Sequence, residues 1–182
     1  TDVAQAAGVD DSVHNFTQVP GWPQYYVGDV DWADYDGDGW LDLYVGNESS
    51  EGRRNPNQLF HNNGDSTFTD VAPAVGSDVV GRTKGVVWGD YDNDGDPDLY
   101  ISRMWQPNVL LANEVVTGAG TWSFRDVATE AGVLEPEMSF PVWFWDFDND
   151  GWLDLYASAY FAGVEDARAL PSQASRGGAQ SA

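Results

Sequence analysis

A nine-residue acidic segment that occurs three times is the feature that most constrains the fold of this chain. The three copies read DYDGDGWLD, DYDNDGDPD and DFDNDGWLD, and they begin at Asp34, Asp90 and Asp146, 56 residues apart each time. An aromatic residue stands two positions before each copy, and the dipeptide Leu-Tyr follows each copy. Regular self-similarity at this spacing is typical of repeat architectures. The chain is therefore predicted to consist of copies of one supersecondary unit.

Two further motifs repeat in the same order. PNQLFHN begins at Pro56 and PNVLLAN at Pro107, while FTDVAPAVG begins at Phe68 and FRDVATEAG at Phe124. The first residues, TDVAQAAGV, match the last motif without its phenylalanine, and neither motif follows the third acidic loop. The sequence therefore predicts about three units, of which the outer two are incomplete.

Short apolar segments separated by Gly, Asn and Asp turns give about four strands in each unit. Four-stranded units of this length are typical of β-propeller blades, so we expect an all-β fold. We expect repeats over residues 1–160, one helical turn near 164–170, and a low-complexity, disordered tail over 161–182. Closed propellers need at least about four blades. The chain is thus predicted to be a fragment, or an arc that missing sequence or another copy completes.

Charge limits the classes of partner. The 182 residues include thirty acids and eight Lys or Arg, which gives a formal net charge of −22. Such a surface disfavours nucleic acid and anionic lipid, because both need positive charge. Cysteine is absent, and no apolar segment reaches the length of a membrane span. We expect no membrane insertion and a cation as the natural counterpart of the acidic loops.

The acidic loop has the spacing of a cation site. Carboxylates at its positions 1, 3, 5 and 9 and the carbonyl of position 7 can converge, and the glycine at position 6 permits the turn. All-oxygen ligation favours calcium, whereas zinc would require His or Cys. The alternative is a solvated turn held by Asx hydrogen bonds. The predicted ligands are Asp34, Asp36, Asp38, Trp40 and Asp42 in the first loop, Asp90, Asp92, Asp94, Asp96 and Asp98 in the second, and Asp146, Asp148, Asp150, Trp152 and Asp154 in the third.

The other candidate functional residues are few. Trp32 and Trp88 hold equivalent repeat positions, which favours packing between units over ligand binding. Trp22, Trp105 and Trp122 are expected in insertions or turns and are better ligand candidates. The two histidines, at positions 14 and 61, have no neighbouring Ser or Cys pattern that indicates nucleophilic catalysis.

The three motifs together resemble a known family. The segment FTDVAPAVGSDVVGRTKGVVWGDYDNDGDPDLYISR is similar to the FG-GAP/VCBS repeat of integrin α-subunit propellers and of many secreted bacterial proteins. The motif set resembles most the cartilage acidic protein group and its bacterial relatives. This resemblance covers about residues 1–160. It implies a calcium-stabilised propeller with an ion in a hairpin loop of each blade, a seven-bladed parent, and an extracellular or periplasmic location.

Three functional hypotheses remain from the sequence, and one of them is a purely structural fragment with no ligand except calcium. The first is a non-enzymatic module in which calcium is structural and the inserted loops bind a protein or carbohydrate ligand. The rival is the propeller portion of a secreted polysaccharide lyase. That rival needs Lys, Arg, His or Tyr gathered in a cleft, and the chain has one Lys and seven Arg.

Overall fold

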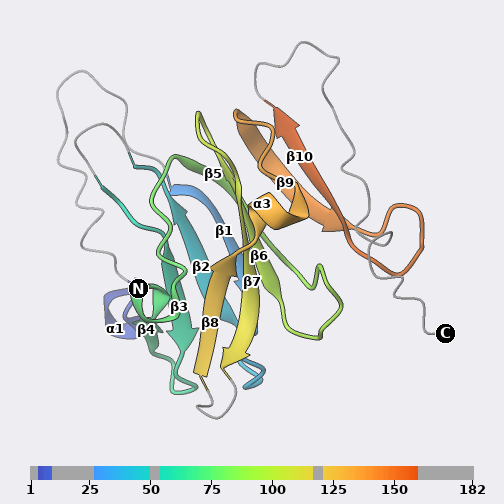
Figure 1. The fold of residues 1–182 in the computed structure, drawn as a ribbon. Coiled ribbons are helices and arrows are strands. Elements are labelled where there is room, and N and C mark those ends of the chain that lie inside the picture. Colours follow the sequence, from blue (N-terminus) through green and yellow to red (C-terminus); the bar gives the residue numbers. More distant parts are fainter. Residues whose placement is uncertain (1–3, 10–26, 50–53, 117–120, 160–182) are drawn as a thin grey trace, which may run out of the picture.

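The computed structural model describes residues 4–9, 27–49, 54–116 and 121–159 (Figure 1). Antiparallel β-strands dominate this part of the chain, as the sequence predicts. The strands form two four-stranded sheets and one two-stranded sheet, which are consistent with propeller blades. The expected helical turn at 164–170 and the tail at 161–182 lie outside the described residues.

The first two sheets share one strand order. The first contains β1 (Val27–Ala33), β2 (Asp42–Asn47), β3 (Gln58–Asn62) and β4 (Phe68–Asp70) in sequence order. The second contains β5 (Thr83–Gly89), β6 (Asp98–Arg103), β7 (Val109–Val116) and β8 (Thr121–Asp126), again in sequence order. Each pair of neighbours is antiparallel, so each sheet is a simple meander. Four strands for each complete unit were predicted.

The third sheet contains only β9 (Ser139–Trp145) and β10 (Asp154–Ala159) within the described residues. The expectation that the third unit is incomplete concerns residues beyond 159, which lie outside the described part of the chain. The expectation that the first unit is also incomplete is wrong, because β1 to β4 form a full four-stranded sheet. The FxDV motif ends a unit rather than beginning it. The missing phenylalanine of the N-terminal copy therefore removes no strand from the first sheet.

The three sheets stack face to face, and their first strands β1, β5 and β9 lie side by side (Figure 1). Between the first and second sheets lies an apolar core in which Tyr44 and Leu59 meet Leu99 and Ile101. Trp88 also packs there, with its ring centroid 6.0 Å from that of Tyr44. This contact agrees with the predicted packing role of Trp88.

A second core lies on the opposite face of the second sheet. Tyr100 and Leu110 pack there against Leu155 and Ala157 of the third sheet. Adjacent residues of β6 therefore serve different cores, since neighbouring side chains of a strand point to opposite faces. Burial on both faces explains why β6 is apolar in sequence rather than alternating.

Two aspartates of β1 join the first strands of neighbouring sheets. Asp29 Oδ2 accepts a hydrogen bond from the Val86 N–H at 3.2 Å, and Asp31 Oδ2 accepts one from the Trp88 N–H at 3.1 Å. β5 is the edge strand of its sheet, so these N–H groups have no neighbouring strand. The carboxylates therefore satisfy an edge that would otherwise remain unpaired.

Each FxDV motif continues into one helical turn that the sequence analysis did not predict. These turns are α2 (Ala72–Val75) and α3 (Ala128–Ala131), and a similar turn, α1 (Ala4–Ala7), follows the N-terminal motif copy. The motif aspartates, Asp70 and Asp126, accept hydrogen bonds from the first N–H groups of α2 and α3. None of the helices in the described part of the chain has the length and apolar character needed to cross a membrane.

Candidate metal sites

The three acidic loops lie between the first and second strands of their sheets and adopt one conformation. In each loop the first aspartate accepts two backbone hydrogen bonds, from the N–H groups of positions 5 and 6. In the first loop Asp34 Oδ1 accepts from Asp38 at 3.0 Å, and Asp34 Oδ2 accepts from Gly39 at 2.9 Å. The same pair of bonds forms at Asp90 and Asp146, with lengths of 3.0 to 3.1 Å.

The aspartate at position 5 of each loop also makes the same hydrogen bond in all three copies. Its carboxylate accepts a hydrogen bond from the backbone N–H of position 7, at 2.8 Å from Trp40, 3.0 Å from Asp96 and 2.9 Å from Trp152. These are the Asx-type bonds expected of a solvated turn. The bonds leave carboxylate lone pairs available, since an ionised carboxylate has about four acceptor sites. The turn interpretation and the cation interpretation are therefore compatible.

Backbone conformation explains the residue types at positions 4 and 6. Position 6 is always glycine, and its φ is +93° at Gly39, +100° at Gly95 and +89° at Gly151. Position 4 is also left-handed, with φ of +70° at Gly37 and +57° at Asn93. Asn is the side-chain-bearing residue that best tolerates this region. The role of position 6 was predicted from the sequence, whereas that of position 4 was not, although the presence of only Gly or Asn there was the available signal.

The last aspartate of each loop ties the loop to the sheet. Asp42 is fully buried, and its two oxygens accept hydrogen bonds from the N–H groups of Tyr35 and Asn62. Asp98 makes the equivalent bonds to Tyr91 and Asn113. These residues therefore have a structural role that does not require a metal.

The third loop has only half of this arrangement. Asp154 Oδ2 accepts a hydrogen bond from the Phe147 N–H at 3.1 Å, but Asp154 Oδ1 is buried without a partner. In the first two sheets the donor to this second oxygen lies on the third strand. The described part of the third sheet has no third strand, so this acceptor is unsatisfied.

Side-chain oxygens converge in all three loops. One ligand atom of each residue lies within 4.8 Å of the others in the sets Asp34–Asp36–Asp42, Asp90–Asp92–Asp94 and Asp146–Asp148–Asp154. Oxygens bound to one calcium ion at 2.3–2.6 Å lie at most about 5 Å apart, so each set fits that ion. Asp38 joins a separate set, whereas Asp98 and Asp150 belong to none. The proposed carbonyl ligands at Trp40, Asp96 and Trp152 stay predictions.

His61, which was considered from the sequence only for nucleophilic catalysis, lies beside the first acidic loop. Its Nδ1 lies 3.3 Å from both Asp36 Oδ2 and Asp42 Oδ1, and the imidazole forms a set with Asp36 and Asp38. The equivalent residue of the second unit is Ala112. This substitution within an otherwise matched motif was the available signal, and it makes the first site chemically different from the other two.

Burial and mutual repulsion raise the pKa values of several loop carboxyls. Burial raises the pKa of Asp42 to about 6 and that of Asp98 to about 7, although backbone hydrogen bonds oppose the rise at both. Burial and the nearby charge of Asp94 also raise the pKa of Asp92. A bound cation would favour the ionised forms and lower these pKa values. Holding these carboxylates buried and close together thus costs electrostatic free energy, and a bound cation would lower this cost.

The structure corrects one of the tryptophan assignments. Trp122 lies in β8 rather than in a turn, and it packs against the first core with its ring centroid 6.4 Å from that of Tyr35. Trp105 does lie in the β6–β7 connection, where its side chain is exposed. Trp22 and His14 lie outside the described residues. Trp32 is half exposed on the free face of the first sheet, where the described chain has no neighbouring sheet.

Comparisons with known proteins agree with this geometry. The profile of the FG-GAP-like repeat family matches residues 34–101, from the first acidic loop to β6. This part of the chain is an FG-GAP-like repeat region. The repeats are similar to cartilage acidic protein 1 of Xenopus tropicalis, with 34% identity over 116 residues, and to that of Homo sapiens, with 33% identity over 121 residues.

Each of these alignments covers 63% of the present chain. The chain spans only about a sixth of the relatives' length, 17% of the first and 16% of the second. The likeness therefore concerns the FG-GAP-like repeats and confirms the family resemblance found in the sequence. The activities and partners of the full-length relatives do not follow from it.

Proposed function

We propose that this chain is a calcium-stabilised β-propeller repeat module of an extracellular or periplasmic binding protein. The observation that supports this most is the threefold recurrence of one loop conformation with converging carboxylates. Calcium neutralises the crowded charges and joins the ends of two strands in each blade. Its role is structural, and the ligand is a protein or carbohydrate. The relatives, named cartilage acidic protein 1, support the extracellular location.

The residues that would hold the ions follow from the geometry. Asp34, Asp36 and Asp42 would serve the first site, next to the separate set of Asp36, Asp38 and His61. Asp90, Asp92 and Asp94 would serve the second site, and Asp146, Asp148 and Asp154 the third. Calcium supplies positive charge and flexible oxygen coordination there, and this chain's backbone N–H groups fix each carboxylate in place.

Further blades stack on the two free faces in this proposal, either from the same polypeptide or from a second copy. The third sheet supports it, because Trp143 and Trp145 are exposed on the face away from the second sheet. Tyr156 stacks on Trp143 there, with ring centroids 4.2 Å apart. Exposed aromatic groups of this kind mark surfaces that other elements cover.

Calcium removal tests the proposal. A cation that binds only the folded state raises stability by mass action. We expect the melting temperature of the full chain to rise with calcium and to fall again on addition of EGTA, with magnesium much less effective. A melting temperature that is the same in calcium and in EGTA would falsify the calcium role.

The lyase hypothesis stays a prediction from the sequence. It requires turnover of an acidic polysaccharide, which the absorbance of unsaturated products would reveal. Our proposal expects no such turnover with or without calcium, and product formation by the purified chain would overturn the non-enzymatic assignment.

A further inference from the structure

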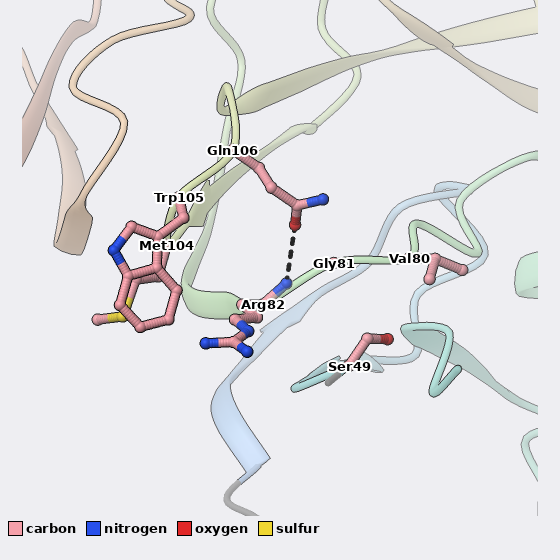
Figure 2. A pocket seen from close by; sticks show the side chains of 7 residues that line it. All are labelled: Ser49, Val80, Gly81, Arg82, Met104, Trp105 and Gln106. Atoms are coloured by element: carbon pink, nitrogen blue, oxygen red, sulfur yellow. Dashed lines mark hydrogen bonds between the residues drawn. The ribbon is translucent and has the colours of Figure 1, made fainter. Parts of the chain in front are cut away.

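A surface pocket of about 360 Å³ lies between the first and second sheets, at the ends of the strands away from the acidic loops (Figure 2). β2 and β6 end beside it and β5 begins there. The pocket is lined by Ser49, Val80, Gly81, Arg82, Met104, Trp105 and Gln106. None of these residues is acidic, although the chain contains thirty acids. The lining itself therefore carries one positive charge, that of Arg82, and no negative charge.

Two arginines, Arg82 and Arg103, lie at this pocket. Arg82 has its guanidinium carbon 4.4 Å from the centroid of the Trp105 ring, a cation–π arrangement. Arg103 lies behind Gly81, where its Nε donates to the Pro107 carbonyl. No carboxylate of the described residues lies within ion-pair distance of either guanidinium. Within the part of the chain that the structure describes, no carboxylate competes with an external anion for Arg82.

The walls of the pocket are held by backbone hydrogen bonds. The Ser49 N–H donates to the Gly81 carbonyl at 2.7 Å, and the Met104 N–H donates to the Arg82 carbonyl at 2.9 Å. Gln106 Oε1 accepts from the Arg82 N–H at 3.1 Å, as Figure 2 shows, which leaves the amide nitrogen Nε2 as a donor for a ligand. The pocket thus offers donors on a preformed frame.

Trp105 provides a flat apolar surface beside these donors. Its side chain is 57% exposed, and its backbone has φ of +59°, a left-handed conformation that is costly for a bulky residue. The Trp105 N–H donates to the Glu137 carbonyl at 2.7 Å, which holds this conformation. Strained residues of this kind cluster at ligand sites.

We propose that this pocket binds a carboxylate-bearing sugar, such as a uronate unit of an acidic polysaccharide. The Arg82 guanidinium pairs with the carboxylate, the Gln106 amide donates to a ring hydroxyl, and the Trp105 ring stacks on the apolar face of the sugar. A pocket of this size lies at the lower end of the range for small ligands. This assignment specifies the ligand class of the proposed binding module, and it therefore rests on that proposal.

An acidic peptide fits this site less well. Peptides that add to a sheet need an exposed strand edge with free backbone groups. Here the N–H groups of Ser49, Arg82 and Met104 already donate to Gly81, Gln106 and Arg82, respectively. The acidic loops also do not repel the sugar strongly, because seven-residue β5 separates them from the pocket by roughly 20 Å. That distance exceeds two Debye lengths of about 8 Å at physiological salt.

Calorimetric titration of the full chain with tetragalacturonate tests the proposal, with its methyl-esterified form and tetraglutamate as comparators. We expect binding of the uronate, at least about tenfold weaker binding of the neutral ester, and weakening by salt. Arg82→Gln and Trp105→Ala should each lower the affinity about tenfold or more. Arg125→Gln and Trp145→Ala change one exposed residue of the same type elsewhere and should leave the affinity unchanged.

Three results would overturn the pocket assignment: no binding of the uronate, equal affinity in the Arg82→Gln variant, or tighter binding of tetraglutamate. Circular dichroism of each variant separates loss of binding from loss of fold. The calcium-dependent rise in melting temperature is measured on the same proteins. If that rise is absent while uronate binding still depends on Arg82 and Trp105, the calcium proposal fails and the pocket stands.

Discussion

Asn113 connects the second acidic loop to the first sheet. Its backbone N–H donates to Asp98 Oδ1 at 2.9 Å, and its side-chain Nδ2 donates to the Tyr35 carbonyl of the first acidic loop at 2.7 Å. Asn113 and both of its partners, Asp98 and Tyr35, are buried. One residue of β7 therefore fixes its own loop to the sheet and fixes the neighbouring loop as well.

Replacement of Asn113 by Ala should lower the free energy of unfolding by about 1–3 kcal/mol, because the Tyr35 carbonyl loses its buried donor. Asn62, the equivalent residue of the first sheet, is the matched control. Among the described residues, its side chain donates only to the exposed Leu41 carbonyl, at 3.1 Å, and contacts no other sheet. Asn62→Ala should therefore cost less in urea denaturation, and equal losses would contradict a role for Asn113 between sheets.

Trp88 and Trp32 allow a second matched comparison. Trp88 packs between the first and second sheets against Tyr44 and Phe124. Trp88→Ala should lower the free energy of unfolding by about 3–5 kcal/mol, as expected for a large aromatic removed from a core. Trp32→Ala should cost much less because Trp32 is 49% exposed. Chemical denaturation measures both, and a larger loss at Trp32 would contradict this packing arrangement.

Calcium binding should depend on the position of an aspartate within its loop. Asp92 belongs to the converging set of the second loop, whereas the side chain of Asp96 does not. We expect Asp92→Ala to reduce the calcium-dependent rise in melting temperature, and Asp96→Ala to leave that rise nearly unchanged. Equal effects of the two substitutions would show that general acidity, rather than the converging set, attracts the ion.

Stability without calcium should depend on pH in a defined direction. The pKa of Asp98 is about 7 in the folded protein, above its unfolded value of about 3.9. The folded state therefore binds more protons between these two values, and stability falls as pH rises from about 4 to 7. Melting temperatures in EGTA should thus be higher at pH 5 than at pH 7.

Asp98→Asn provides the control for this pH dependence, because the substituted side chain does not titrate. Its melting temperature should vary less between pH 5 and 7 than that of the unchanged chain. A melting temperature in EGTA that rises across this interval would contradict the raised pKa of Asp98.

The sequence predicts the features that depend on local pattern. The acidic loops, the four-strand units and the packing of Trp88 all follow from residue types at fixed spacing. The contacts of Asp29 and Asp31 with the second sheet do not, because they join residues 57 positions apart and depend on how the sheets stack. The approach of His61 to the first loop was missed for a related reason. It follows from the pairing of β2 with β3, which the strand pattern leaves undefined in register.

The hydrogen bonds from Val86 and Trp88 to the β1 aspartates make the contact between these two sheets directional. One partner supplies carboxylates and the other supplies backbone N–H groups, so the contact is heterologous. Two copies of this chain cannot reproduce it by a twofold rotation that brings identical surfaces together. Further contacts of this kind would add sheets head to tail with one rotational sense.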